Sequence, residues 1–139
     1  MTVARDIMTR HVRCVRASET VLDAANRMAE FDVGAMPICG EDNRLEGMLT
    51  DRDIVVKVLA AGKDPRAIHA GELAQGEAVT ISADDDVEEV LRTMAAHQVR
   101  RVPVIDGHDL VGIVSQADVA RSLEDPDVGS LIAALSVDY

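Results

Sequence analysis

The chain has 139 residues and is acidic, with 25 Asp and Glu against 14 Lys and Arg, a formal net charge of −11. That length fits one ordinary domain or two small halves sharing a core, and the 47% apolar content excludes wholesale disorder. The negative charge and the absence of Trp disfavour nucleic-acid binding, which needs a basic face and stacking aromatic side chains.

Strand and helix signals alternate through the first half of the chain. A short strand around residues 12–15 precedes a helix capped by Ser18, whose apolar face is Val21, Leu22, Ala25, Met28 and Ala29. Residues 33–39 form a strand that Pro37 shortens or leaves locally unpaired, and a hairpin loop at 40–44 leads to the returning strand 45–49. A second helix is predicted from about Asp51 to Ala61, with an apolar face of Ile54, Val55, Val58 and Leu59.

The second half repeats the first in order and in register. Apolar and proline positions recur 66 residues later, so that Val21, Met28, Val33 and Pro37 become Val87, Met94, Val99 and Pro103. Asp84 takes the place of the cap Ser18, and the hairpin at 106–109 is one residue shorter than its counterpart. We therefore expect an α+β protein of two β-α-β-β-α repeats, residues 1–65 and 66–122. In the tail 123–139, Leu131, Ile132 and Leu135 predict a short helix that packs on a neighbour.

Each repeat closes on the same motif, at residues 47–53 and 112–118. Both copies read Gly, two apolar residues, Thr or Ser, two variable positions and Asp, which describes a strand turning directly into a helix. One reading is a capping box, in which hydroxyl and acid satisfy first-turn N–H groups. The other is a phosphate seat at a helix N-terminus, with the Asp accepting from ribose hydroxyls. The residues alone leave both readings open.

This doubled unit resembles the tandem cystathionine-β-synthase (CBS) domain pair, or Bateman module, over residues 4–122. Further matches are Asp6-Ile7-Met8 and the segment 97–104, His-Gln-Val-Arg-Arg-Val-Pro-Val. The resemblance implies two repeats about a pseudo-two-fold axis, with clefts between them for an adenosine-containing ligand such as AMP, ADP, ATP or S-adenosylmethionine. It also implies a homodimer and a regulatory output through another protein in stress or energy response.

Carried over by position, the resemblance implies a set of ligand-binding residues. Thr50 and Asp53 would serve one site, and Ser115 and Asp118 the other. Apolar walls for the base would come from Val12, Met36, Ala78 and Val102. A phosphate in this acidic chain would need an arginine, and the candidates are Arg52 and one of Arg100 and Arg101, with Arg101 preferred. Adjacent strand residues point to opposite faces, so only one of that pair can face a given cleft.

Two cysteines, Cys14 and Cys39, are predicted to lie on neighbouring strands. They are read as two reduced thiols, as a disulfide or redox switch, or, with His11, as metal ligands.

No nucleophile elbow, Walker loop or His-Glu-x-x-His motif occurs, so we expect no catalysis and no required cofactor. The alternative to ligand sensing is a structural or redox-responsive protein acting through a dimer surface and these thiols. No apolar run reaches membrane length and no signal peptide is visible, so a stand-alone cytoplasmic protein without membrane contact is expected.

Overall fold

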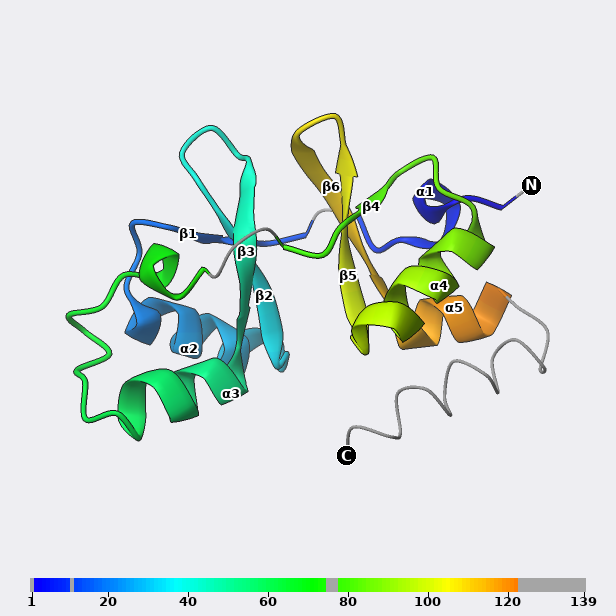
Figure 1. Ribbon diagram of the computed structural model, residues 1–139. Coiled ribbons are helices and arrows are strands. Elements are labelled where there is room, and N and C mark those ends of the chain that lie inside the picture. Colours follow the sequence, from blue (N-terminus) through cyan, green and yellow to red (C-terminus); the bar gives the residue numbers. More distant parts are fainter. Residues whose placement is uncertain (1, 11, 75–77, 123–139) are drawn as a thin grey trace. The chain divides into compact units, whose positions relative to one another are not determined.

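The computed structural model describes residues 2–10, 12–74 and 78–122 and divides into two compact units. The first-repeat unit is Arg13–Ala78, and the second-repeat unit combines Met1–Val12 with the chain from Val79 onward. Each unit has one three-stranded sheet and its own apolar core (Figure 1). The predicted mixed fold of two repeats is therefore confirmed.

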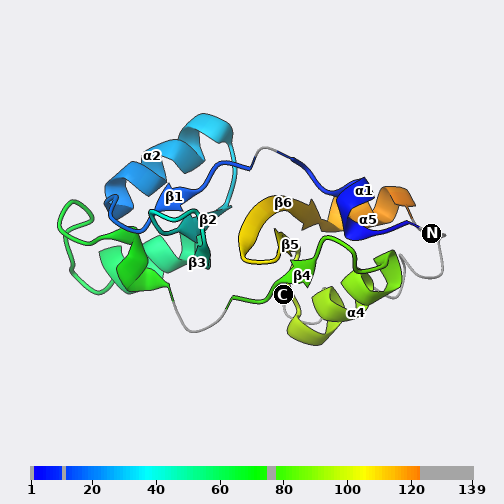
Figure 2. The same cartoon turned by 90° about the horizontal axis from the view of Figure 1, so that it is seen from above.

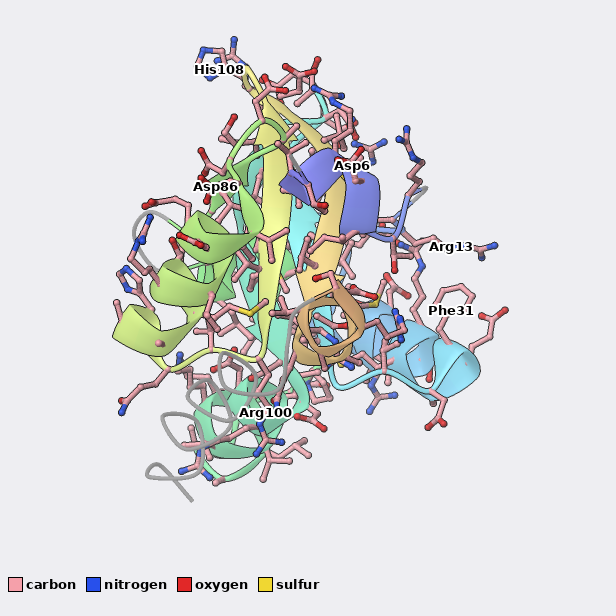
Figure 3. All side chains as sticks on the ribbon, turned by 90° about the vertical axis from the view of Figure 1, so that its right-hand side faces the viewer. Asp6, Arg13, Phe31, Asp86, Arg100 and His108 are labelled. Atoms are coloured by element: carbon pink, nitrogen blue, oxygen red, sulfur yellow. The ribbon has the colours of Figure 1, made fainter. Side chains whose placement is uncertain are left out.

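The sheet of the first-repeat unit has the order β1-β2-β3, with β1 parallel and β3 antiparallel to the central β2. Its elements are β1 (Val15–Arg16), α2 (Val21–Phe31), β2 (Ala35–Cys39), β3 (Leu45–Thr50), α3 (Asp51–Asp53), the π-helix η1 (Ile54–Leu59) and the 3₁₀-helix η2 (Ala70–Leu73). Val21 and Met28 of α2 pack with Ile38 and Leu49 of the strands in an aliphatic core. Outside that core, the Arg13 guanidinium lies 4.4 Å from the centre of the Phe31 ring (Figure 3).

The second-repeat unit has the same topology, with sheet order β4-β5-β6. Its elements are α1 (Ala4–Ile7), β4 (Ile81–Ser82), α4 (Val87–His97), β5 (Arg101–Asp106), β6 (Asp109–Ser115) and α5 (Gln116–Ser122). Within this unit α1 lies beside α5 although the two helices come from opposite ends of the chain (Figure 2). Val90, Met94, Val104 and Val114 are fully buried in its core.

Proline sets where each central strand begins its parallel pairing. Pro37 is paired with Met48 on the antiparallel side, but β1 pairs only with the two residues that follow it, Ile38 and Cys39. Pro103 and β4 repeat this arrangement. The missing proline N–H therefore interrupts no ladder bond to β1 or β4, and β2 keeps its five residues without the predicted local unpairing.

Both predicted caps of the first helices were wrong by two residues. Thr20, rather than Ser18, caps α2 in a reciprocal box with Asp23, at 3.0 and 3.1 Å. Asp86, rather than Asp84, caps α4 and accepts from the Glu89 N–H at 2.8 Å. An extra turn precedes each helix, so the earlier polar residues take other partners. Ser18 donates to Glu41 and Asp84 pairs with Arg5.

The two compact units are Arg13–Ala78 and the remainder of the chain, because the segments that precede the two repeats are exchanged between them. Ala4 is fully buried in the second-repeat core, and its N–H donates to the carbonyl of Asp85 at 2.8 Å. Ala70 is buried in the first-repeat core in the same way, with its N–H 2.8 Å from the carbonyl of Glu19. Each segment thus completes the core of the other repeat. The helix predicted for the tail, residues 123–139, lies outside the described residues.

The helix after β3 differs from the prediction. It begins at Asp51 as α3 and continues as a π-helix, in which the Ala60 N–H donates to the Val55 carbonyl at 2.8 Å. Ile54 and Val58 are buried as predicted, but Val55 and Leu59 are not part of the buried face, with 55% and 54% of their surface exposed. The wider π-turn changes the angular spacing of the side chains, which a 3.6-residue period does not anticipate.

Candidate functional site

The repeated motif forms the turn from β3 into α3 in the first-repeat unit. The Asp53 N–H donates to the Thr50 hydroxyl at 3.0 Å, and the Thr50 N–H donates to the Asp53 carboxylate at 3.0 Å. The second Asp53 oxygen lies 3.1 Å from the Lys57 ammonium. The capping-box reading is therefore confirmed here. The threonine hydroxyl and both carboxylate oxygens already have partners within the unit.

These partners also determine the charge of Asp53. Partial burial by itself would raise the pKa of this carboxyl group. The hydrogen bond from the Thr50 N–H and the neighbouring Lys57 ammonium outweigh it, so the pKa is lowered. Asp53 is a carboxylate at neutral pH and accepts hydrogen bonds only.

The second-repeat unit repeats this geometry where β6 turns into α5. The Asp118 N–H donates to the Ser115 hydroxyl at 3.2 Å, and the Ser115 N–H donates to the Asp118 carboxylate at 2.8 Å. The remaining Asp118 oxygen pairs with the Arg121 guanidinium. Asp118 is only 7% exposed and is the buried charged residue of the described chain, whereas the Arg121 side chain is 72% exposed. An exposed cation is therefore paired with a buried acid.

The residue opposite each hydroxyl differs between the turns. Thr50 faces Ala35 across the β2–β3 ladder, whereas Ser115 faces the exposed Arg101 across β5–β6. Directly opposed residues lie on the same face of a sheet with their Cβ atoms about 5 Å apart. The structure therefore brings Arg101 and Ser115 together.

The residues that open the two helices also differ in charge. Asp51 follows Thr50, and its carboxylate accepts from the Arg52 N–H at 2.8 Å. That first-turn N–H is thus already occupied by an anionic side chain. In the second turn Gln116 and Ala117 stand at the same positions and bring no negative charge. Asp51 and Arg52 offset each other in net charge, so the second turn differs from the first in having Arg101 opposite its hydroxyl and no Asp at the position of Asp51.

The four apolar residues predicted to contact the base of the ligand are distributed over the two units. Met36 and Ala78 belong to the unit that carries Thr50, and Val12 and Val102 to the unit that carries Ser115. Val12 and Ala78 are half-buried. Met36 is 2% exposed and Val102 fully buried, each grouped with the core of its own unit. A role for these four in holding a base stays a prediction.

Cys14 and Cys39 are both free thiols of the first-repeat unit. Burial, followed by the adjacent Cys14 side chain, raises the pKa of the Cys39 thiol to about 12. Cys39 is therefore protonated and a poor nucleophile near neutral pH. Across the described ranges of the chain, no three His, Cys, Asp or Glu side chains are grouped as metal ligands. His11, the predicted third ligand, lies outside those ranges.

Comparison with known proteins shows the family to which this chain belongs. The CBS domain model matches this chain twice, at residues 4–60 and 70–125, so the chain belongs to the CBS domain family as a tandem pair of the regulatory type. It is 53% identical over 135 residues to hypoxic response protein 1 of Mycobacterium tuberculosis, which covers 97% of this chain and 94% of that protein. None of the helices in the described part of the chain is long and apolar enough to cross a membrane.

Two solved structures place the fold among CBS pairs. The crystal structure of hypoxic response protein I with two coordinated zinc ions has a TM-score of 0.83 and 57% identity, and the match covers 88% of this chain and 100% of that one. The crystal structure of CBSX2 in complex with AMP has a TM-score of 0.76 and 23% identity, covering 88% of this chain and 96% of that one. The second likeness concerns the fold alone.

Sequence reasoning missed how the two motif acids are neutralised. Lys57 lies four residues after Asp53, and Arg121 three residues after Asp118. Such i,i+4 and i,i+3 pairs are readable from spacing once a helix is assigned. The pairing of Arg101 with Ser115 was not readable in this way, because it depends on strand register.

Proposed function

We propose that this protein is a regulatory CBS pair that binds an adenosine-containing ligand, with the phosphate held at the second-repeat turn. The observation that carries the proposal is the exposed Arg101 directly opposite Ser115, beside a turn without the acid that Asp51 adds to its counterpart. Arginine offers paired donors to phosphate oxygens. The AMP complex of the structurally similar CBSX2 supports the class of ligand.

In this mechanism the serine adds the ligand to the partner that it already has, whereas the acid exchanges one internal partner for the ligand. The Ser115 hydroxyl can donate to a phosphate oxygen while it still accepts from the Asp118 N–H. The exposed Arg121 leaves one oxygen of Asp118, which then accepts from ribose hydroxyls. Arg52 and the Thr50–Asp53 turn form a second, weaker site under this proposal. Ligand binding favours one conformation of the pair, and a partner protein reads that conformation in a stress or energy response.

Calorimetric titration tests the proposal with AMP, ATP, S-adenosylmethionine and adenosine. Arg101→Gln should weaken AMP binding about tenfold or more, because a hydrogen bond to a charged group contributes about 1.5–3 kcal/mol. The same variant should leave adenosine binding unchanged, since adenosine has no phosphate. Arg44→Gln, on the exposed hairpin of the first-repeat unit, is the matched control. Folded protein that binds none of these ligands would overturn the proposal.

A second candidate function uses the two thiols, because Cys14 and Cys39 are adjacent within one unit. Under this alternative the protein responds to oxidation through a Cys14–Cys39 disulfide and its binding sites stay empty. A free-thiol titration after treatment with a small disulfide oxidant measures it. Loss of both thiols, with a higher melting temperature that a reductant reverses, would support it. Two thiols that stay free under oxidant would contradict it.

The family also leads us to propose a homodimer that acts in the cytoplasm and lacks catalytic activity. Light scattering of the purified chain tests the dimer, and a mass of one chain at micromolar concentration would contradict it. Cell fractionation tests the location.

A further inference from the structure

The side chain of Met8 lies directly against the backbone of β6 in the second-repeat unit. Met8 is the C-cap of α1 and is half-buried against the second-repeat core. A Cβ atom built at Gly112 would lie 2.5 Å from the Met8 sulfur and 2.8 Å from its Cγ atom. The thioether therefore occupies the space that a side chain at position 112 would need, and glycine permits this close contact.

The residue that follows Met8 is bonded to the same strand. The Thr9 N–H donates to the Ile113 carbonyl at 2.8 Å, and the Ile113 N–H donates to the Thr9 carbonyl at 3.1 Å. Because β6 is an edge strand of its sheet, this pair covers backbone groups that would otherwise be free. Helix α1 contacts both β6 and α5, which are the two elements that meet at the Ser115 turn (Figure 2). Met8 and Thr9 thus hold the leading segment beside that turn.

The fold does not require a sulfur atom at this position. Ala4 and Ala70 are equivalent residues 66 positions apart, each buried in a core and bonded through its N–H to the preceding turn. At the same offset Met8 corresponds to Ala74, which is half-buried against the first-repeat core. The first repeat is therefore built with a methyl group where the second has a thioether. The oxidisable atom at this position belongs to the second repeat alone.

Met8 is also more accessible than the core methionines. Met28, Met36 and Met94 are 6%, 2% and 0% exposed. Among the methionines of the described ranges, only Met8 and Met48, which lies in β3 of the other unit, are half-buried. A small oxidant in solution therefore reaches these two sulfur atoms before it reaches those of the cores.

We propose that Met8 is a peroxide-sensitive modification site, and that its sulfoxide releases the leading segment from the second-repeat unit. The sulfur lone pair attacks one peroxide oxygen, and the O–O bond breaks as the S–O bond forms. The other oxygen leaves with its proton as water or an alcohol. The sulfur loses an electron pair to the peroxide, so the thioether is oxidised and the peroxide reduced. Methionine sulfoxide reductases reverse the change, which makes it a switch.

The surroundings of Met8 suit a thioether and oppose a sulfoxide. Oxidation turns a flexible apolar side chain into a polar and larger one. The Thr9 and Ile113 N–H groups beside the sulfur already donate to each other's carbonyls, so they have no hydrogen bond to offer the new oxygen. The Gly112 backbone leaves no space toward the strand. The sulfoxide is better hydrated outside this contact, and the leading segment separates from β6.

Hydrogen exchange after treatment of the full chain with tert-butyl hydroperoxide tests this proposal. Peptide mass mapping should find the Met8 sulfoxide, and exchange in residues 79–122 should become about tenfold faster. Methionine sulfoxide reductases A and B together should restore slow exchange, whereas dithiothreitol alone should not. Both cysteines lie in the first-repeat unit, so thiol oxidation is read separately, in residues 13–74.

Substitutions assign the effect to one sulfur atom. Met8→Leu is close in volume and has no sulfur, so peroxide should leave residues 79–122 of this variant protected. Met8→Ala, which places there the side chain of Ala74, is a second variant with the same expectation. Met48→Leu is the matched control and should respond as the wild type does.

Three outcomes would overturn the proposal. The first is faster exchange of residues 79–122 in peroxide-treated Met8→Leu or Met8→Ala. The second is a wild-type Met8 sulfoxide with unchanged exchange. The third is an unmodified Met8 in a solution where added N-acetylmethionine amide is fully oxidised.

Discussion

The two repeats share the same sheet topology and the same turn into the closing helix, and they differ in the side chains around that turn. Each ends in a reciprocal box, Thr50 with Asp53 and Ser115 with Asp118, formed by hydrogen bonds of 2.8–3.2 Å. Around the boxes the surroundings diverge, since Ala35 stands opposite Thr50 and Arg101 opposite Ser115. The difference teaches that the motif residues maintain the helix start in both units. Their neighbours then determine the charged groups and the opposite side chain at each turn.

The largest loss of stability is expected in the segments that precede the two repeats, because each segment completes the core of the other repeat. We expect Ala4→Asp to destabilise the second-repeat unit by about 3–5 kcal/mol, because it places a charge in a fully buried site. Ala70→Asp should do the same to the first-repeat unit. Hydrogen exchange measured by mass spectrometry should show lost protection at residues 79–122 for the first variant and at residues 13–74 for the second.

The matched control is Ala96→Asp, at an exposed position of α4, which should leave exchange nearly unchanged. Lost protection in residues 13–74 alone after Ala4→Asp would contradict the exchange of leading segments.

A smaller effect should follow from adding one methyl group at Gly112. A Cβ atom there would lie 2.9 Å from the carbonyl oxygen of Thr9, which is backbone and cannot move aside alone. We expect Gly112→Ala to lower the free energy of unfolding by about 1–3 kcal/mol, the usual cost of overpacking. Chemical denaturation measures it, with Gly107→Asn as control, because that turn glycine has open space and a φ of +66° that Asn tolerates. Equal stability of the Gly112→Ala variant and the wild type would contradict the close approach of Gly112 to the Thr9 carbonyl oxygen.

The two capping boxes should contribute equally in spite of their different surroundings. Thr50→Ala and Ser115→Ala each remove one hydroxyl acceptor, and each should cost about 1 kcal/mol. Thermal unfolding without ligand measures both. Ser18→Ala is the control, since Ser18 bonds to a side chain rather than to a first-turn N–H, and should cost less. A much larger loss at one turn would show that the boxes are not equivalent.

The smallest expected effect is a pH dependence at Asp53. Its folded-state pKa is lowered below the unfolded value of about 3.9, so its contribution to stability is complete above that pH. The contribution is lost as the pH falls through the lower folded-state pKa. Asp53→Asn should therefore lower the melting temperature at pH 7, and the gap to wild type should narrow below about pH 4. A gap that stays constant with pH would show that the charge of Asp53 contributes nothing.

Local patterns predicted the fold well and the site in part. Helical spacing identified α2 and α4, and the shared motif identified the boxes at Asp53 and Asp118. The caps shifted by two residues, because Ser and Asp in the preceding turns offered the same side-chain oxygen as the true caps. The exposure of Val55 and Leu59 was not predicted, because the π-helix departs from the 3.6-residue period of the α-helix.

The sequence by itself determined the two repeats, the order of their strands and helices, and the position of the motif that starts each closing helix. These features depend on residues within a few positions of one another, where spacing and hydrogen-bonding type specify the geometry. Only the tertiary structure decided that Ala4 completes the second repeat and Ala70 the first, and that Arg101 stands opposite Ser115. Those arrangements depend on core packing and strand register between distant residues, and local propensity carries no information about either.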